Sequence, residues 1–193
     1  MTTSETSPRK HSVLKILAPV AVIVAMVGGG LFALSRMAGN PGPADVAVVV
    51  GATIPDFELQ DLQGKKSKFS DLGAKGTKVI MINFWATWCE ACVVEMPSIV
   101  ELRRSFKDRG FEVLAVNVDE NPTAVVPKAA RELGIDFPVY IDPETKLAAL
   151  FDVHAIPLTV IIDKTGKVLF VESGERNWNG SDIREQMERW LSG

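Results

Sequence analysis

The cysteines of this chain, Cys89 and Cys92, are separated by two residues in the run Asn-Phe-Trp-Ala-Thr-Trp-Cys-Glu-Ala-Cys. They follow an apolar segment with β-strand character and precede a helical pattern. Thiols at this spacing can close into a disulfide and open again, so the pair predicts dithiol–disulfide exchange. An uncharged N-terminal segment, long enough to cross a membrane, places this chemistry outside the cytoplasm, where disulfides persist.

The helix predicted at residues 90–108 gives the two sulfurs different roles. If Cys89 stands at its N-terminus, unpaired backbone N–H groups and the helix dipole stabilise the thiolate and lower the pKa of that thiol. Cys89 is then the attacking sulfur. Cys92 lies one turn further along the same face, within reach of a disulfide, and can resolve a mixed disulfide formed at Cys89.

Other uses of a cysteine pair fit the sequence less well. A structural zinc site needs further Cys or His ligands, and the chain offers only His11 and His154. Covalent haem attachment needs a histidine after Cys92, where Val93 stands. A purely structural disulfide stays open, although so short a loop constrains the unfolded chain very little. The sequence therefore predicts neither a metal nor a cofactor.

The uncharged run at residues 16–35 covers the ~30 Å hydrocarbon core of a membrane when helical. Basic residues gather before it and only Arg36 follows closely, so the N-terminus is expected inside. We predict a cytoplasmic tail at residues 1–15 and a transmembrane signal anchor at 16–35 in the inner membrane, with the remainder extracytoplasmic or periplasmic. A cleaved signal peptide is the alternative, because residues 33–35 resemble a processing site.

Residues 36–52 contain Gly, Pro and Asn and predict a linker, which leaves a folded domain at residues 53–193. That length suits one domain with a single core. The formal net charge is -3, and residues 53–193 contain no cluster of Lys or Arg. These features argue against nucleic acid as a partner.

Short β-type runs alternate with longer helical patterns across residues 53–193, which predicts an α/β domain with a mixed sheet covered by helices on both faces. The turn sequence Asp163-Lys164-Thr165-Gly166 makes the last two strands an antiparallel hairpin. Strands are expected at residues 57–60, 67–69, 78–84, 111–118, 139–141, 158–162 and 167–172, and helices at 90–108, 123–133, 146–151 and 181–191.

A proline opens the predicted strand at residues 158–162. Pro157 removes a donor from the sheet ladder, and a cis Ile156–Pro157 bond would put the Ile156 backbone at the sheet end where the cysteines lie. An ordinary trans proline is the alternative. The combination with Trp-Cys-x-x-Cys favours the cis form, and the Ile156 edge could then hold a substrate backbone by strand-like pairing.

The run from Asn83 to Pro97, together with Ile156–Pro157, resembles the TlpA-like branch of the thioredoxin superfamily. Members of this branch are membrane-anchored extracytoplasmic thiol:disulfide oxidoreductases and include the cytochrome c maturation thioredoxins. The resemblance covers about residues 53–193. It implies a thioredoxin fold with a central mixed sheet flanked by helices, an N-terminal β extension and an inserted helix–strand unit within residues 121–151.

The resemblance implies an enzyme that reduces disulfides of extracytoplasmic client proteins, with apocytochrome c as a candidate client and a membrane electron donor of the CcdA/DsbD type. It implies that Trp88, Ile156 and Pro157 bind substrate. Glu95 takes the position of an acid that helps to manage the protons of the dithiol. Because Glu95 lies one turn beyond Cys92, partial burial should raise the pKa of its carboxyl, with a solvated helix glutamate as the alternative.

Three positions limit what the resemblance implies. Ala91 stands where the family often has proline and Ala155 where it often has glycine. Because the dipeptide between the cysteines tunes the redox potential, that potential cannot be carried over from the family. Asn83 falls where thioredoxin itself has a buried aspartate, which leaves Glu95 as the nearby candidate for the proton role.

Two other functions stay open from the sequence. A thiol peroxidase of the peroxiredoxin type would carry its reactive cysteine in a Thr-x-x-Cys setting, whereas Thr87 precedes Cys89 by two residues. A non-catalytic thioredoxin-fold binding module would carry an inert cysteine pair.

Overall fold

Apolar residues fill almost the whole of the central strand β3, Val79–Trp85, and every residue of this strand is buried. The computed structural model describes residues 48–193. Within them β3 lies between a parallel neighbour, β4 (Phe111–Asn117), and an antiparallel neighbour, β6 (Leu158–Asp163). A strand that is covered on both faces reads as a continuous apolar run, as the sequence predicts here.

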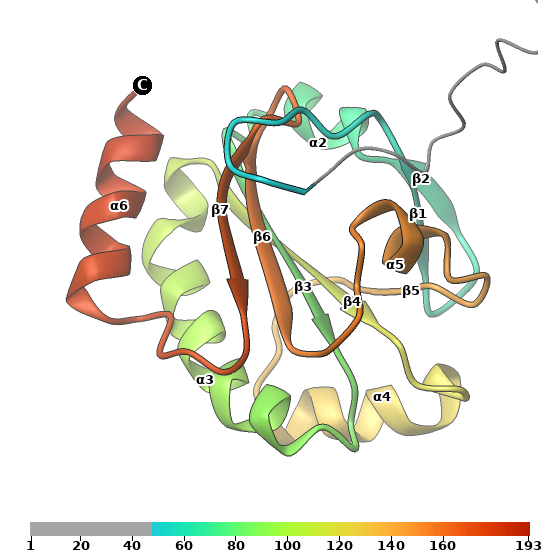
Figure 1. Ribbon diagram of the computed structural model, residues 1–193. Coiled ribbons are helices and arrows are strands. Elements are labelled where there is room, and N and C mark those ends of the chain that lie inside the picture. Colours follow the sequence, from blue (N-terminus) through green and yellow to red (C-terminus); the bar gives the residue numbers. More distant parts are fainter. Residues whose placement is uncertain (1–47) are drawn as a thin grey trace, which may run out of the picture. The chain divides into compact units, whose positions relative to one another are not determined.

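The sheet is mixed and has 7 strands in the order β2-β1-β5-β4-β3-β6-β7 (Figure 1). β7 (Val168–Ser173) forms the predicted hairpin with β6, and β5 (Val139–Ile141) runs parallel to β4. β1 (Glu58–Asp61) pairs antiparallel with both β5 and β2 (Lys66–Lys68). The mixed sheet, the N-terminal β extension and the inserted strand are therefore confirmed.

Helices cover both faces of this sheet (Figure 1). One face packs against α3 (Glu90–Phe106), α4 (Pro122–Glu132) and α6 (Ser181–Ser192). The other face packs against α5 (Lys146–Leu150) and the short α2 (Ser70–Ala74). These helices divide the apolar interior into two cores, one on each side of the sheet.

Alternate side chains of β3 enter the two cores. Met81 and Trp85 lie in the core beneath α3, whereas Ile82 and Phe84 lie in the opposite core. This alternation is the two-residue period of a strand. It directs the residues that precede the cysteine pair toward the side of the sheet on which α3 begins.

Helix α2 is the one element of the described residues that the sequence pattern does not predict. It contains 5 residues, too few for an apolar repeat at helical spacing to show. Its first turn is held from outside, because the Ser70 backbone N–H donates to Asp56 Oδ1 at 2.9 Å and the Lys68 backbone N–H donates to Asp71 Oδ2 at 3.0 Å.

The predicted end of α3 at Asp108 is two residues too late. The helix ends at Phe106 and tightens into a 3-10 turn, Lys107–Arg109. Gly110 then reverses the chain at φ 98°, in the left-handed region that glycine tolerates. A Cβ at Gly110 would also lie 3.1 Å from the Gly76 carbonyl oxygen, so a larger residue would meet backbone there.

Ordered pairing begins slightly before the expected domain start at Thr53. The Gly51 N–H donates to the Val168 carbonyl and the Val168 N–H donates to the Ala52 carbonyl, both at 2.8 Å. No helix within residues 48–193 is long and apolar enough to cross a membrane. The predicted tail and signal anchor, and the linker up to residue 47, lie outside the described residues and stay predictions.

We predict that Phe84→Ala lowers the free energy of unfolding by about 3 to 5 kcal/mol, because truncation leaves a cavity in a packed core. Phe84 is fully buried, and its ring centroid lies 5.5 Å from that of Phe151. Urea unfolding of the oxidised protein measures the change. The control is Val94→Ala on the exposed side of α3, which should cost less than about 0.5 kcal/mol. Equal losses in the two variants would contradict the packing described.

Candidate active site

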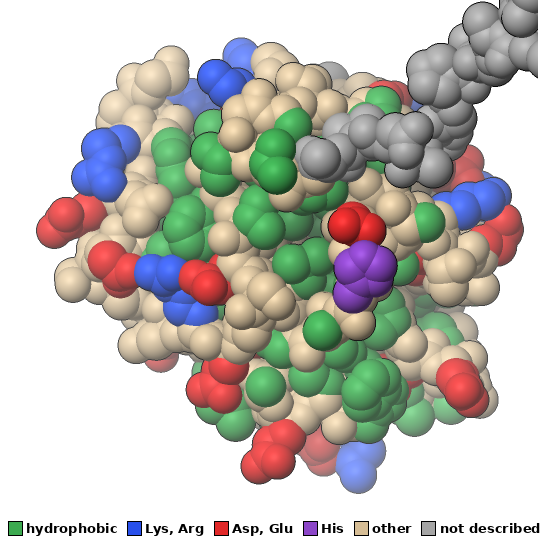
Figure 2. Space-filling view, viewed as in Figure 1, with side chains coloured by type: hydrophobic (Ala, Val, Ile, Leu, Met, Phe, Trp, Pro, Cys, Tyr) green, Lys and Arg blue, Asp and Glu red, His purple; other side chains and the backbone are tan. Residues whose placement is uncertain are grey.

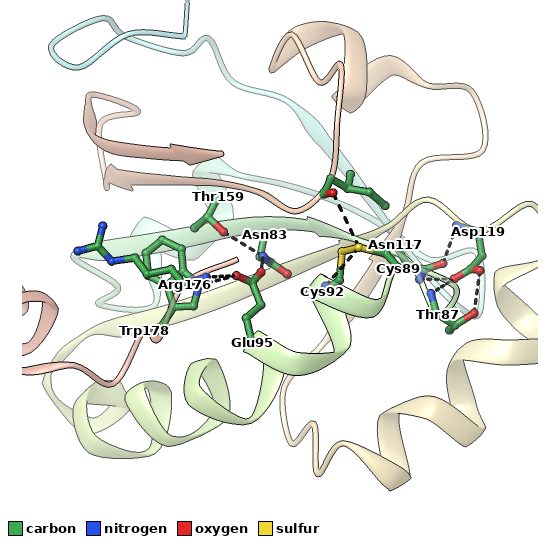
Figure 3. Close-up of a disulfide and its surroundings, with 11 residues drawn as sticks. Asn83, Thr87, Cys89, Cys92, Glu95, Asn117, Asp119, Thr159, Arg176 and Trp178 are labelled. Carbon is green, nitrogen blue, oxygen red and sulfur yellow. Dashed lines mark hydrogen bonds between the residues drawn. A yellow bond between two sulfur atoms is a disulfide. The ribbon is translucent and has the colours of Figure 1, made fainter. Parts of the chain in front are cut away.

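Cys89 is the N-cap of α3, and Cys92 lies in its first turn (Figure 3). The two sulfurs form a disulfide, with Cα atoms 5.3 Å apart. Cys89 is 8% exposed and Cys92 is fully buried. The predicted placement of Cys89 at the start of the helix is confirmed, and only the Cys89 sulfur lies near solvent.

The start of α3 surrounds Cys89 with backbone donors. The Cys92 N–H points at Cys89 Sγ, 3.2 Å away, and Cys89 has the extended backbone of an N-cap residue, with φ −89° and ψ 102°. Unpaired N–H groups and the positive end of the helix dipole favour negative charge at this place. In the reduced protein they would stabilise a thiolate on Cys89.

The chain entering β6 closes the other side of the sulfur. The Ile156–Pro157 peptide bond is cis, as the sequence predicts, and the Ile156 carbonyl oxygen lies 3.8 Å from Cys89 Sγ. β6 begins at Leu158, which pairs with Phe84 of β3. The sheet register therefore brings the Ile156 backbone to the end of β3, where the cysteine pair follows.

Glu95, one turn beyond Cys92, is 2% exposed. Its carboxylate accepts three hydrogen bonds (Figure 3). Asn83 Nδ2 donates to Oε1 at 2.8 Å, Trp178 Nε1 donates to Oε2 at 2.9 Å, and the Arg176 backbone N–H donates to Oε2 at 3.2 Å. The alternative of a solvated helix glutamate is wrong.

Burial raises the pKa of the Glu95 carboxyl above its usual range. The hydrogen bonds from Trp178, Asn83 and the Arg176 backbone act in the opposite direction, because they favour the charged carboxylate, while the nearby charge of Glu175 raises the pKa further. Desolvation is the largest of these effects, as expected for a carboxylate without a cationic partner. The predicted direction of the shift is confirmed.

Asn83 connects Glu95 to the sheet. Its amide nitrogen donates to Glu95 and also to Thr159 Oγ1 at 2.9 Å. Its Oδ1 atom is buried and has no hydrogen-bond partner among the described residues. In Figure 3 this oxygen lies on the side of the amide toward Cys92. Asn83 therefore links the Glu95 carboxylate to Thr159 of β6.

An acid that sequence reasoning missed fixes the loop before Cys89. Asp119 follows β4 and accepts from Thr87 twice, at 2.9 Å from its backbone N–H and at 2.8 Å from its hydroxyl. Asn117 Nδ2 also donates to Asp119, at 2.7 Å. The signal in the sequence is the Asn-x-Asp that ends a buried strand beside the cysteine pair, because adjacent parallel strands end together.

A cleft of about 680 Å³ is lined in part by Trp88, which directly precedes Cys89, and by Ile156, whose carbonyl oxygen lies 3.8 Å from Cys89 Sγ. Trp88 is 69% exposed. Acidic residues contribute to the lining at Asp119, Glu120 and Asp142, and the lining residues, all in the described part of the chain, include no Lys or Arg. The structure thus places Trp88 and Ile156 in the lining of one cleft, whereas Cys89 is not among the lining residues. Pro157 is not among the residues that line it.

His154 also lines this cleft. The histidine coloured purple in Figure 2 lies at the surface, next to an acidic side chain. His154 Nε2 lies 2.9 Å from Asp152 Oδ1, and both side chains are largely exposed. Residues 48–193 contain no group of His, Cys, Asp and Glu side chains arranged to hold a metal ion.

Comparisons with known proteins agree with this geometry. Residues 50–171 match the model of the AhpC/TSA family. The chain is 40% identical over 142 residues to thiol-disulfide oxidoreductase ResA of Geobacillus thermodenitrificans, covering 74% of this chain and 78% of that one. It is 39% identical over 124 residues to ResA of Bacillus subtilis, covering 64% and 67%.

A solved structure has the same fold. A thiol:disulfide interchange protein of the thioredoxin family from Chlorobium tepidum superposes with a TM-score of 0.61 at 26% identity, covering 73% of this chain and 96% of that one. The fold, the cysteine pair and these relatives agree. The chain therefore belongs to the AhpC/TSA family and is a thioredoxin-fold thiol:disulfide oxidoreductase similar to ResA.

Proposed function

We propose that this oxidoreductase works as a reductase of disulfides in extracytoplasmic proteins. The observation that carries the proposal is the asymmetry of the Cys89–Cys92 pair. Cys89 lies at the helix N-terminus, is 8% exposed and directly follows Trp88, which lines a cleft, whereas Cys92 is fully buried. A client disulfide can therefore approach Cys89 alone, and Cys92 can react only with a sulfur that is already bound to Cys89.

The proposed reaction has two exchange steps. The Cys89 thiolate attacks one sulfur of the client disulfide, so the client S–S bond breaks, a mixed disulfide forms, and the first client thiolate leaves and takes up a proton from solvent water. Cys92 then loses its proton and attacks Cys89 Sγ, which releases the second client thiolate and forms the Cys89–Cys92 disulfide. The client gains two electrons and two protons, and the enzyme is left oxidised.

Glu95 is proposed to accept the proton that Cys92 loses in the second step. Its carboxyl is buried one turn beyond Cys92, and Asn83 donates a hydrogen bond to it. Because burial raises its pKa, the carboxyl is a better proton acceptor than an exposed glutamate would be. It can then pass the proton to the departing client thiolate.

The residues that line the cleft indicate what kind of client segment it would bind. Trp88 offers an exposed aromatic surface, and the Ile156 backbone lies beside the reactive sulfur. The acidic lining, without Lys or Arg among its residues, favours a client segment with positive charge next to its cysteine. Apocytochrome c is the client that the resemblance suggests.

In this proposal the enzyme is anchored in the membrane and is reduced by a membrane protein. Residues 16–35 anchor the chain in the inner membrane with residues 1–15 inside, and the domain works on the extracytoplasmic side. A membrane protein of the CcdA/DsbD type would return the enzyme to its dithiol form by supplying two electrons and two protons per cycle.

We predict that Cys92→Ser accumulates mixed disulfides with client proteins, because Cys89 attacks and nothing resolves the bond. Cys89→Ser should accumulate none. Acid-quenched samples separated without reductant measure the adducts, and the double variant is the control. Equal trapping by the two single variants, or trapping through Cys92 alone, would contradict the assigned roles.

We predict that Glu95→Gln slows disulfide exchange by at least about tenfold and lowers the apparent pKa of the dithiol, because a nearby negative charge that opposes thiolate formation is lost. The exchange rate and the alkylation of Cys89 are measured across pH. Glu101→Gln, at an exposed glutamate of the same helix, is the control and should resemble the wild type. Unchanged profiles in Glu95→Gln would remove the proton role from Glu95.

The same variant reports the protonation of Glu95 through stability. Because the folded-state pKa lies above the ordinary 4.5, the folded chain keeps a proton that the unfolded chain has lost. The unfolding free energy of the oxidised wild type, taken relative to Glu95→Gln, should therefore fall as pH rises from 4.5 through the folded-state pKa, and stay constant above it.

We predict that the full-length chain stays in the membrane fraction, with residues 53–193 open to added protease only from the extracytoplasmic side. Fractionation and protease treatment of spheroplasts test this. A soluble form whose N-terminal sequence begins near Arg36 would show that the segment is a signal peptide.

A further inference from the structure

The loop between β7 and α6, residues 174–180, makes hydrogen bonds to Glu95 and Ser98 in the middle of α3. Trp178 is fully buried in this loop. Its indole N–H donates to Glu95 Oε2 at 2.9 Å, and its backbone N–H donates to Ser98 Oγ at 3.0 Å. Ser98 Oγ in turn donates to the Glu95 carbonyl at 2.7 Å. The indole is thus fixed against the same helical turn whose carboxylate it contacts.

A second group of contacts holds the loop closed over this carboxylate. The Arg176 guanidinium pairs with Glu172 and Asp182 and lies over the Trp178 ring, 5.9 Å from its centroid. The Trp178 ring also packs edge-on against Phe170, with centroids 6.2 Å apart. These contacts hold the ring in the orientation in which its indole N–H donates to Glu95.

We propose that Trp178 is a positioning residue for disulfide exchange, holding the Glu95 carboxylate in its charged form beside Cys92 by donating the indole hydrogen bond. This rests on the proposed role of Glu95 as the proton acceptor. The indole donates but cannot accept, so it binds the carboxylate better than the neutral acid. Losing it would make Glu95 hold its proton to higher pH.

The other groups around Glu95 do not replace this contact. On α3 Cys92 lies one turn before Glu95 and titrates only when the Cys89–Cys92 disulfide is reduced. On the loop, the charge of Glu175 raises the pKa of Glu95. Strands β3 and β6 offer the uncharged Asn83 and Thr159. The Arg176 guanidinium is engaged by its two acids, so that residue reaches Glu95 through its backbone N–H alone.

The test compares Trp178→Phe with Trp190→Phe in the full-length chain held in detergent micelles. Both indoles lie 6.2 Å from the Phe170 ring, but only that of Trp178 donates to Glu95. The rate of disulfide exchange with a disulfide peptide is measured across pH. The readout is the part of this pH–rate profile that reports the ionisation of Glu95, that is, the limb that disappears in Glu95→Gln. Trp178→Phe should move this limb upward by about one pH unit, equivalent to about tenfold in the protonation constant, and Trp190→Phe should leave it in place.

A spectroscopic readout tests the same hydrogen bond without activity. With ¹⁵N-labelled indoles, the 4 tryptophans give separate N–H signals, and Trp178→Phe identifies that of Trp178. This signal should move with pH at the midpoint of Glu95, and the movement should vanish in Glu95→Gln. If Trp178→Phe does not fold, Ser98→Ala removes the acceptor of the Trp178 backbone N–H and should move the limb in the same direction by a smaller amount.

Two results would overturn the inference, and they differ from each other. If Glu95→Gln removes the limb but Trp178→Phe leaves it at the wild-type pH, Glu95 keeps its role and Trp178 contributes packing only. If Glu95→Gln leaves the limb in place, the proton role of Glu95 fails and the inference falls with it.

Discussion

The burial of β3 is the constraint on which the active site depends. All of its residues are inaccessible to solvent, and it pairs with β4 on one side and β6 on the other. The chain must leave the sheet at the end of this strand, and Cys89 follows within a few residues, at the start of α3. The same pairing with β6 brings the Ile156 carbonyl to 3.8 Å from Cys89 Sγ. The Cys89 sulfur is therefore positioned by the sheet rather than by a flexible loop.

Burial also imposes a condition on the helix that follows. Glu95 lies on the inner face of α3, and a buried carboxylate is costly unless donors surround it. The donors come from β3, through Asn83, and from the loop after β7, through Arg176 and Trp178. Residues from distant parts of the sequence thus converge on one carboxylate. The closing loop and α6 are thereby linked to the cysteine pair, although neither contributes a sulfur.

Local pattern is sufficient to predict most of the fold and the dithiol. The apolar runs mark the strands of the mixed sheet, and the CxxC spacing marks the pair at the helix start. The cis bond at Ile156–Pro157 was predictable only by joining two motifs that are far apart in sequence. Helix α2 is too short to carry a repeat. The clamp of Asp119 on Thr87 and the contacts of Trp178 depend on which strand ends and loops meet, and spacing along the chain does not encode that.

The polar interior beside Cys92 is less well satisfied than the rest of the core. Asn83 Oδ1 is buried without a partner among the described residues, and Glu95 has donors but no cation to neutralise its charge. An apolar pair in these positions would avoid both costs, since incompletely paired buried networks are less favourable than an apolar core. Such exceptions are expected where chemistry requires them. The proposed exchange requires the buried Cys92 thiol to lose its proton in this interior, and a carboxylate whose pKa is raised by burial lies there, one helical turn away.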